Sequence, residues 1–221
     1  MLKAENIYKS YGKKEVLKGA SISVMPGEIS ALVGKNGCGK STLLQIITGT
    51  MKADRAEISF FGKDAIKDSK VFSKYSGYVP QDDPLFDELS VKDNLRFWAC
   101  GIKDPDLSVI EQFGLKDLLN SKVSSLSGGM KRRLTIASTL QRKPPVLILD
   151  EPTSSLDLYY QESIREWMKD YVSRNGTVVL STHNEKEILL ADTVWLFHEG
   201  KTRKITKEEL DMDDIRRAIS S

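Results

Sequence analysis

One eight-residue stretch constrains this chain more than any other, and it reads Gly34-Lys35-Asn36-Gly37-Cys38-Gly39-Lys40-Ser41. Before it, Ile29 to Val33 forms a short apolar run that is typical of a buried strand. After it, residues 40–48 place leucine and isoleucine at helical spacing, and Gly49 follows as a C-cap. The pattern therefore predicts a strand, a glycine-rich loop and a helix in direct succession.

This stretch satisfies the pattern G-x-x-x-x-G-K-[ST] of phosphate-binding loops. Glycines let backbone N–H groups turn toward bound phosphates, and the N-terminus of the following helix adds a partial positive charge. In such a loop Lys40 neutralises the β- and γ-phosphates of a nucleotide, and the Ser41 hydroxyl holds Mg²⁺. The alternative is a glycine-rich turn that only caps a helix, and the strand before the loop argues against it. The residues expected to contact the nucleotide here are Gly34, Asn36, Gly37, Cys38, Gly39, Lys40, Ser41 and Thr42.

The overall composition excludes several other classes of protein. The chain has 221 residues, of which 40% are hydrophobic, and 33 Lys and Arg nearly balance 31 Asp and Glu. This is typical of an ordinary globular protein and gives no reason to expect a nucleic-acid-binding face. We expect a cytosolic chain, since no apolar run approaches the roughly 18 residues that span a bilayer. Two cysteines, Cys38 and Cys100, and two histidines form no zinc-binding pattern.

The remaining segments predict an α/β fold. Val146 to Leu149 and Thr177 to Leu180 are apolar runs typical of buried parallel strands. The residues between Ser90 and Lys143 have helical periodicity, which indicates a helical subdomain inserted into the α/β core. Near the end, residues 193–197 and 201–205 flank Glu199-Gly200 as a hairpin, and residues 207–219 are expected to form a charged terminal helix.

Two adjacent acids, Asp150 and Glu151, directly follow the first of these strands. Ligands of α/β proteins bind at the carboxyl edge of the sheet, where both acids are expected to lie. Phosphoryl transfer needs a carboxylate for the Mg²⁺ shell and a group that activates the attacking water. Asp150 is the candidate metal ligand and Glu151 the candidate general base. The alternative is a solvated strand end, because four apolar residues and an acid are a weak motif alone.

A further stretch, Leu126-Ser127-Gly128-Gly129-Met130, resembles the signature of the ATP-binding cassette (ABC) ATPases. Other motifs similar to those of the family appear in order. Tyr11 resembles the aromatic residue that stacks on adenine, Gln81 the Q-loop glutamine, and His183 the switch histidine. Ser154-Ser155-Leu156-Asp157 resembles the D-loop. The resemblance covers essentially the whole chain and implies an ATPase that uses ATP and Mg²⁺.

The resemblance also implies a P-loop NTPase (RecA-like) core over residues 1–84 and 144–221, with an antiparallel β subdomain and a helical subdomain over residues 85–143. Family members dimerise head to tail, so that Ser127, Gly128 and Gly129 of one copy contact the γ-phosphate held by Lys40 of the other. Gln81 would touch Mg²⁺ together with Ser41 and Asp150, His183 would contact the γ-phosphate, and Asp157 would cross the dimer interface. Since the chain holds one copy of each element, we expect a homodimer or a heterodimer with a similar cassette.

The resemblance further implies a peripheral subunit at the inner face of the cell membrane, bound to integral membrane permease subunits. Side chains at Leu85, Phe86, Phe97 and Trp98 would lie in the region that receives a coupling helix, and exporter-type cassettes are the most similar. Met130 and Asn184 depart from the usual glutamine and acid. Two alternatives stay open: a soluble ABC ATPase with a role outside transport, and a nucleotide-dependent regulator that hydrolyses little.

Two smaller features each carry two interpretations. Cys38, near Lys40 at a helix N-terminus, has surroundings that lower a thiol's pKa, which predicts inactivation by maleimides and protection by ATP. The alternative is an inert small side chain. Lys131, Arg132 and Arg133 are interpreted as a solvated helix face rather than a nucleic-acid contact.

Overall fold

The computed structural model describes residues 1–99, 104–154 and 156–220. Cys100 and Ser155, both singled out in the sequence, lie outside these residues. Within the described part of the chain, the strands form a six-stranded sheet and a four-stranded sheet. No helix in these three ranges is both long and apolar enough to span a membrane.

The six-stranded sheet has the order β10-β9-β3-β8-β7-β6. It contains β3 (Ile29–Val33), β6 (Ser76–Val79), β7 (Val146–Asp150), β8 (Thr177–Ser181), β9 (Thr193–His198) and β10 (Lys201–Thr206). Neighbouring strands are parallel except β10, which pairs antiparallel with β9. Every residue of β3, β7 and β8 is buried, as expected for strands covered on both faces. The predicted parallel strands and the terminal hairpin are confirmed.

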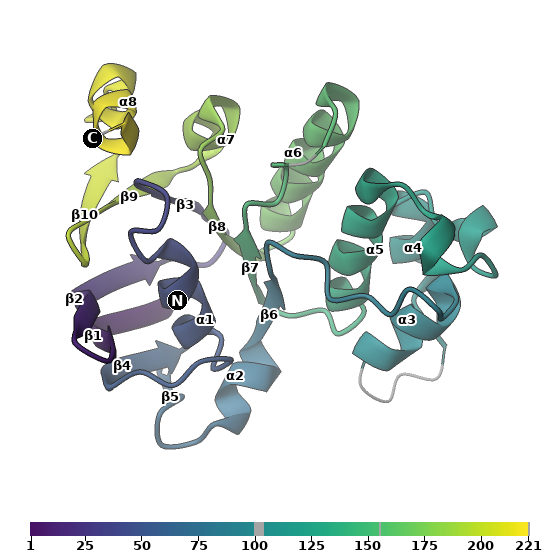
Figure 1. Cartoon of the computed structure of the whole chain (residues 1–221), viewed down its shortest axis with the longest axis horizontal. Coiled ribbons are helices and arrows are strands. Elements are labelled where there is room, and N and C mark those ends of the chain that lie inside the picture. The colour runs from purple at the N-terminus through teal and green to yellow at the C-terminus, as the bar shows by residue number, and fades with distance from the viewer. Residues whose placement is uncertain (100–103, 155, 221) are drawn as a thin grey trace.

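The four-stranded sheet is antiparallel, with the order β2-β1-β4-β5. It contains β1 (Leu2–Tyr11), β2 (Lys14–Val24), β4 (Arg55–Phe60) and the short β5 (Lys63–Asp64). Its inner face packs on α1 (Lys40–Ile47) and through it on the larger sheet, because Leu17, Leu43 and Ile148 belong to one buried cluster. The helix that follows the glycine-rich loop is therefore held between two sheets (Figure 1).

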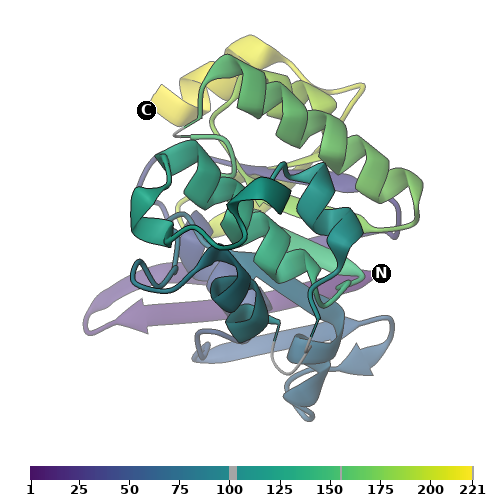
Figure 2. The ribbon, with the colours of Figure 1, turned by 90° about the vertical axis from the view of Figure 1, so that its right-hand side faces the viewer.

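The other face of the larger sheet packs on helices. Leu147 and Leu149 point to this face, whereas Val146 and Ile148 face α1, as the two-residue period of a strand requires. The helical region contains α3 (Val91–Trp98), α4 (Leu107–Gln112), η1 (Lys116–Leu118), η2 (Val123–Ser125) and α5 (Gly128–Leu140). These elements lie together at one end of the molecule (Figure 1), and they face the viewer in the view turned by 90° (Figure 2).

The remaining helices are α2 (Lys70–Tyr75), α6 (Leu158–Ser173), α7 (Glu185–Leu190) and α8 (Met212–Ser220). The terminal helix begins five residues later than predicted. Residues 207–211 form a turn and a loop after β10, and Ile215 on α8 is buried. The charged residues in this segment are compatible with both a helix and a solvated turn. The first residue of α8 could therefore not be predicted from composition.

The sheet topology brings three loops to one edge. β3, β7 and β8 are parallel neighbours, so the loops that follow Val33, Asp150 and Ser181 all leave from their carboxyl ends. Ligands of open α/β sheets bind at this edge.

Candidate functional site

The glycine-rich loop is held close to its neighbours by glycines that no other residue could replace without strain. Gly39 precedes α1 with a φ of 119°, and a Cβ there would lie 2.8 Å from Val16 Cγ1. A Cβ on Gly34 would lie 2.5 Å from the carbonyl oxygen of Phe197. Both glycines allow the loop to pack directly on β2 and β9, which fixes its path toward the N-terminus of α1.

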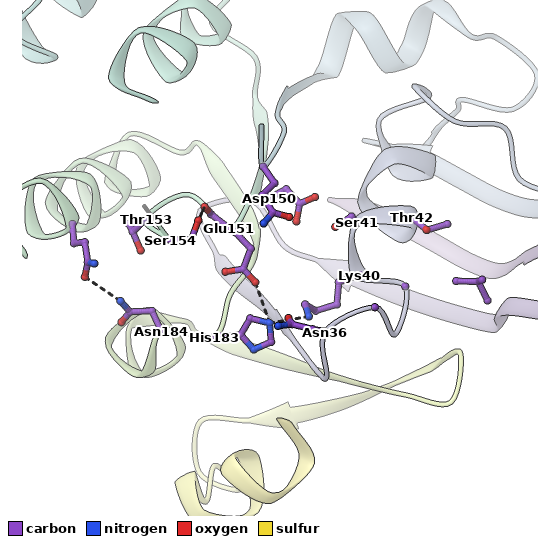
Figure 3. Close-up of a pocket in the computed structure, with 15 residues that line it drawn as sticks. Asn36, Lys40, Ser41, Thr42, Asp150, Glu151, Thr153, Ser154, His183 and Asn184 are labelled. Atoms are coloured by element: carbon purple, nitrogen blue, oxygen red, sulfur yellow. Dashed lines mark hydrogen bonds and ion pairs between the residues drawn. The ribbon is translucent and has the colours of Figure 1, made fainter. Parts of the chain in front are cut away.

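A pocket of about 670 Å³ opens beside this loop (Figure 3). It collects residues that the sequence analysis named from four separate segments, namely Asn36, Gly37, Gly39, Lys40, Ser41, Thr42, Gln81, Asp150, Glu151 and His183. The pocket is also lined by Val16, Thr153, Ser154, Gln161 and Asn184. The predicted convergence of the loop with the acids after β7 is therefore present in the structure.

The Lys40 ammonium joins the loop to His183. Its Nζ donates to the carbonyl oxygens of Gly34 at 2.7 Å and Lys35 at 3.1 Å, and it lies 3.1 Å from His183 Nε2. Lys40 is only 6% exposed. A buried cation held by neutral carbonyls is a strong anion-binding group, because desolvation increases its attraction for an opposite charge.

Glu151 approaches the same nitrogen of the histidine that Lys40 contacts. Its Oε1 is 3.2 Å from His183 Nε2, so one ring nitrogen faces both the carboxyl and the Lys40 ammonium (Figure 3). This nitrogen can donate to Glu151 or accept from Lys40, but not both at once. The backbone of Glu151 has a φ of 47°, an uncommon value for a residue with a side chain, and its N–H donates to the Ser181 carbonyl oxygen at 3.2 Å.

The electrostatic surroundings suit Glu151 to proton transfer near neutral pH. Burial is the main cause that raises the pKa of Glu151 to about 7, with smaller contributions from the Glu187 and Asp150 carboxyls and against the opposing effect of Lys40. Burial and the Lys40 charge lower the pKa of His183. A carboxyl with a pKa near the working pH is a good general base, and a neutral imidazole beside it can donate or accept a hydrogen bond.

Asp150 is oriented by hydroxyl groups on neighbouring strands. It is 2% exposed, Ser181 Oγ donates to its Oδ1, and the Tyr78 hydroxyl donates to its Oδ2 at 3.3 Å. Burial and the Asp150 charge raise the pKa of Tyr78, so this hydroxyl remains a donor. Asp150, Ser41 and Gln81 line the same pocket and offer carboxylate, hydroxyl and amide oxygens, the donor set that Mg²⁺ prefers.

Two loops of the site are connected by a residue that the sequence analysis missed. Glu187 on α7 is 1% exposed, and both of its carboxylate oxygens accept hydrogen bonds from hydroxyl groups. Thr153 Oγ1 donates to Oε1 at 2.7 Å, and the Thr182 hydroxyl donates to Oε2. Glu187 thus ties the loop that carries Glu151 to the loop that carries His183. No sequence signal marks it, because it lies in a run of charged residues that resembles a solvated helix start.

Several predicted residues lie outside the pocket. Tyr11 is 48% exposed, and its hydroxyl donates to Met51 Sδ. Ser127 caps α5 by accepting from the Met130 N–H, and Asp157 caps α6 by accepting from the Tyr160 N–H. Ser127, Gly128 and Asp157 are exposed, and Gly129 is half-buried beside them. The pocket of one chain therefore contains the loop and the two acids but not the residues predicted to act from a second copy.

Two expectations about side-chain environment are wrong. The pKa of Cys38 is raised rather than lowered, because burial outweighs the effects of Lys40 and of backbone N–H groups, which favours the inert interpretation, and inactivation by maleimides stays a prediction. Arg132 is 5% exposed rather than part of a solvated face. Sequence periodicity did not show either outcome, since both depend on contacts with distant segments.

Comparisons with known proteins identify the family of the chain. The family model described as ABC transporter matches residues 17–154. The chain is 36% identical over 95% of its length to the linearmycin resistance ATP-binding protein LnrL of Bacillus subtilis, of which it spans 70%. It is 35% identical over 89% of its length to the Nod factor export ATP-binding protein I of Rhizobium etli, of which it spans 65%. It is also 35% identical over 95% of its length to the spermidine/putrescine import ATP-binding protein PotA of Mycoplasma mycoides, of which it spans 62%.

Solved structures show the same fold. The chain matches a dimeric ATP-binding cassette in a post-hydrolysis state bound to ADP and phosphate with a TM-score of 0.84 at 25% identity. The match covers 94% of this chain and 99% of the other. The expected α/β fold with a P-loop NTPase core is thereby confirmed.

Proposed function

This chain belongs to the ABC transporter family as an ATP-binding, ATP-hydrolysing subunit, and from that premise we propose that it drives export through separate membrane-spanning partners. The observation that carries the proposal is the convergence of Lys40, Asp150, Glu151 and His183 on one pocket. These residues come from three separate segments, namely the start of α1, the end of β7 and the loop after β8, and together they offer the charges and the proton acceptor that phosphoryl transfer from ATP needs.

In the proposed reaction the loop and Lys40 hold the β- and γ-phosphates. Glu151 accepts a proton from water while the water oxygen forms a bond to the γ-phosphorus and the bond to the β–γ bridging oxygen breaks. ADP and inorganic phosphate are the products. When the phosphates bind, they draw the Lys40 ammonium away from His183 Nε2. The Nε2–H group can then donate to Glu151 or to a γ-phosphate oxygen, so that Glu151 is oriented as a base only when nucleotide is present.

We propose that Mg²⁺ accompanies the nucleotide. Ser41, Gln81 and Asp150 would hold it, and the metal would neutralise phosphate charge. No group of three or more His, Cys, Asp or Glu side chains suited to a metal occurs among the described residues. This fits an ion that takes much of its coordination from ATP and water rather than from the protein.

The pKa of Glu151 predicts how activity depends on pH. We expect kcat/KM for ATP to fall as the pH drops below about 7, because a protonated Glu151 cannot accept the proton of water. Initial rates at constant ionic strength and saturating Mg²⁺ from roughly pH 5.5 to pH 9 measure this profile. A rate that stays constant down to about pH 5.5, as a glutamate with the ordinary pKa of 4.5 would give, would contradict the assignment.

We propose that the active form is a dimer in which each chain completes the other's site. The Ser127 and Gly129 region lies at the N-terminus of α5, where backbone N–H groups and the helix dipole attract anions. It is absent from the pocket that Lys40 lines. A homodimer and a heterodimer with a similar cassette both satisfy this arrangement.

We further propose that the membrane partner docks in a groove of about 520 Å³ between α2, α3 and α5. Leu85 and Trp98 line it, and α5 contributes Ser138 to it. Trp98 Nε1 and Ser138 Oγ are buried and have no hydrogen-bond partner among the residues that the structure describes. The apolar side chains Leu85 and Trp98 favour an occupant that offers apolar contacts.

Export is favoured over import by the segments 81–86 and 94–98, which resemble exporter cassettes, and by the relatives for Nod factor export and linearmycin resistance. The match to an import protein is of similar identity. The location that follows is the cytoplasmic face of the membrane, through the partner. Recovery with ribosomes or DNA would instead favour an ABC ATPase outside transport.

A charge placed in the groove tests the docking site. We expect Leu85→Arg to lower co-purification with a polytopic membrane protein by at least about tenfold and to leave basal ATP hydrolysis within about twofold. Leu85 is half-buried at the groove, so the arginine can reach solvent without unfolding the chain. Leu189→Arg is the matched control, since Leu189 is 53% exposed on α7 and does not line the groove. Equal co-purification of both variants would contradict the assignment.

A further inference from the structure

A buried cation on α5 has no part in the proposed reaction and does not line its pocket. Arg132, on the first turns of α5, is 5% exposed. Burying a guanidinium is costly unless its donors are satisfied, so its partners show what the residue holds in place. We propose that Arg132 is a positioning residue that fixes Glu151 and Gln81 relative to α5, so that ATP hydrolysis depends on the placement of this helix.

The first set of partners surrounds the two acids after β7. Arg132 Nη2 donates to the carbonyl oxygen of Asp150 at 2.8 Å and lies 3.3 Å from that of Glu151. Arg132 Nε donates to the carbonyl oxygen of Pro152 at 3.1 Å. Three consecutive carbonyl groups are thus held by one side chain, directly behind the strained backbone of Glu151.

The second set of partners surrounds Gln81. Arg132 Nη1 donates to the carbonyl oxygen of Pro80, lies 3.3 Å from that of Gln81, and is 3.2 Å from Asp83 Oδ1. Asp83 supplies the one negative charge of the set, with its side chain 22% exposed. The planar guanidinium presents its donors in a fixed fork, so the two backbone segments cannot shift independently while all of these bonds persist.

Because Arg132 lies on α5, a movement of this helix is transmitted to the backbone segments that Arg132 holds. Ser127 caps the same helix at its N-terminus, and Thr135 and Ser138 on it line the groove proposed for the membrane partner. A movement of α5 caused at the groove or at Ser127 therefore pulls on the carbonyl groups of Asp150 and Glu151. A misplacement of about 1 Å at a catalytic group can lower a rate about 100-fold.

Arg132→Lys tests the inference, which rests on the proposed roles of Glu151 and Gln81. Lysine keeps the charge but cannot span both segments. We expect kcat to fall about 10- to 100-fold, while the Kd for ATP changes by less than about threefold because the glycine-rich loop is untouched. Because it hydrolyses ATP slowly, Arg132→Lys is expected to accumulate as an ATP-bound dimer, which light scattering detects. A variant that is only less stable would not accumulate this dimer.

A second variant and a control keep the test independent of folding. Asp83→Asn removes the charge from a partly exposed position and is expected to lower kcat by about 3- to 10-fold without loss of Tm. Arg165→Lys is the matched control, because Arg165 is 3% exposed, pairs with Glu162 on α6, and makes no hydrogen bond to the described residues of the segments after β6 and β7.

Three outcomes would overturn the inference. Arg165→Lys could lower kcat as much as Arg132→Lys does, or Arg132→Lys could lose ATP binding and the dimer together with its rate. In the third outcome, Arg132→Lys hydrolyses ATP at the wild-type rate while Glu151→Gln is inactive. This result would overturn the role of Arg132 but leave the proposed function intact. A full rate in Glu151→Gln, in contrast, overturns the proposed role of Glu151 and this inference with it.

Discussion

A Glu151→Gln variant is expected to hold ATP in a stable dimer and to hydrolyse it at least about 100-fold more slowly than the wild-type chain. The amide has nearly the shape of the carboxyl, and its oxygen can keep the contact with His183 Nε2, now at 3.2 Å. It cannot accept a proton from water. The charge lost is one that burial and the carboxyls of Glu187 and Asp150 already disfavour, so the fold should tolerate the change.

Steady-state hydrolysis against protein concentration, with the dimer followed by light scattering, measures this effect. Below the dimer Kd the wild-type rate should rise with the square of concentration, because two chains form each site. Glu111→Gln is a suitable control, since Glu111 is exposed, pairs with Lys116 and lies far from the pocket. Turnover by Glu151→Gln at the wild-type rate would mean that another group activates the water.

Much of the site could be predicted from sequence because its residues follow one another along the chain. The loop from Gly34 to Ser41 and the pair Asp150-Glu151 each adjoin an apolar run, and parallel strands bring such run ends to one edge of a sheet. A short motif that directly follows a predicted strand can therefore be placed in the fold from the sequence alone.

Residues that hold the site together could not be predicted in this way. The partners of Arg132 lie between 18 and 52 residues away in sequence, and those of Glu187 come from the loops after two different strands. Burial of a charged side chain is a tertiary property, so a basic run such as residues 131–133 has the same local pattern whether it is solvated or buried. The raised pKa of Cys38 has the same origin, because burial outweighed the local helix N-terminus.

The pocket of a single chain lacks the signature residues, and this has a direct consequence for mixtures of inactive variants. Lys40→Ala removes the buried cation of the loop. Ser127→Asp keeps a good N-cap for α5 but places a negative charge where the partner's γ-phosphate is proposed to bind. Each variant alone is expected to lose at least about 100-fold in activity. An equal mixture is expected to recover about a quarter of the wild-type rate, because random pairing makes half of the dimers mixed and each mixed dimer has one intact site of two.

A second mixture distinguishes shared sites from mere contact between chains. Lys40→Ala and Glu151→Gln both damage the half-site of their own pocket, so a mixed dimer of these two variants contains no intact site. It should show no recovery under conditions in which Lys40→Ala with Ser127→Asp recovers. If each chain instead formed its whole site alone, neither mixture would gain activity, and the exposed Ser127 would act within its own chain. Lys40 lines the pocket, whereas Ser127 is exposed outside it. If Ser127 acts on the pocket of the other chain, only the first mixture recovers activity.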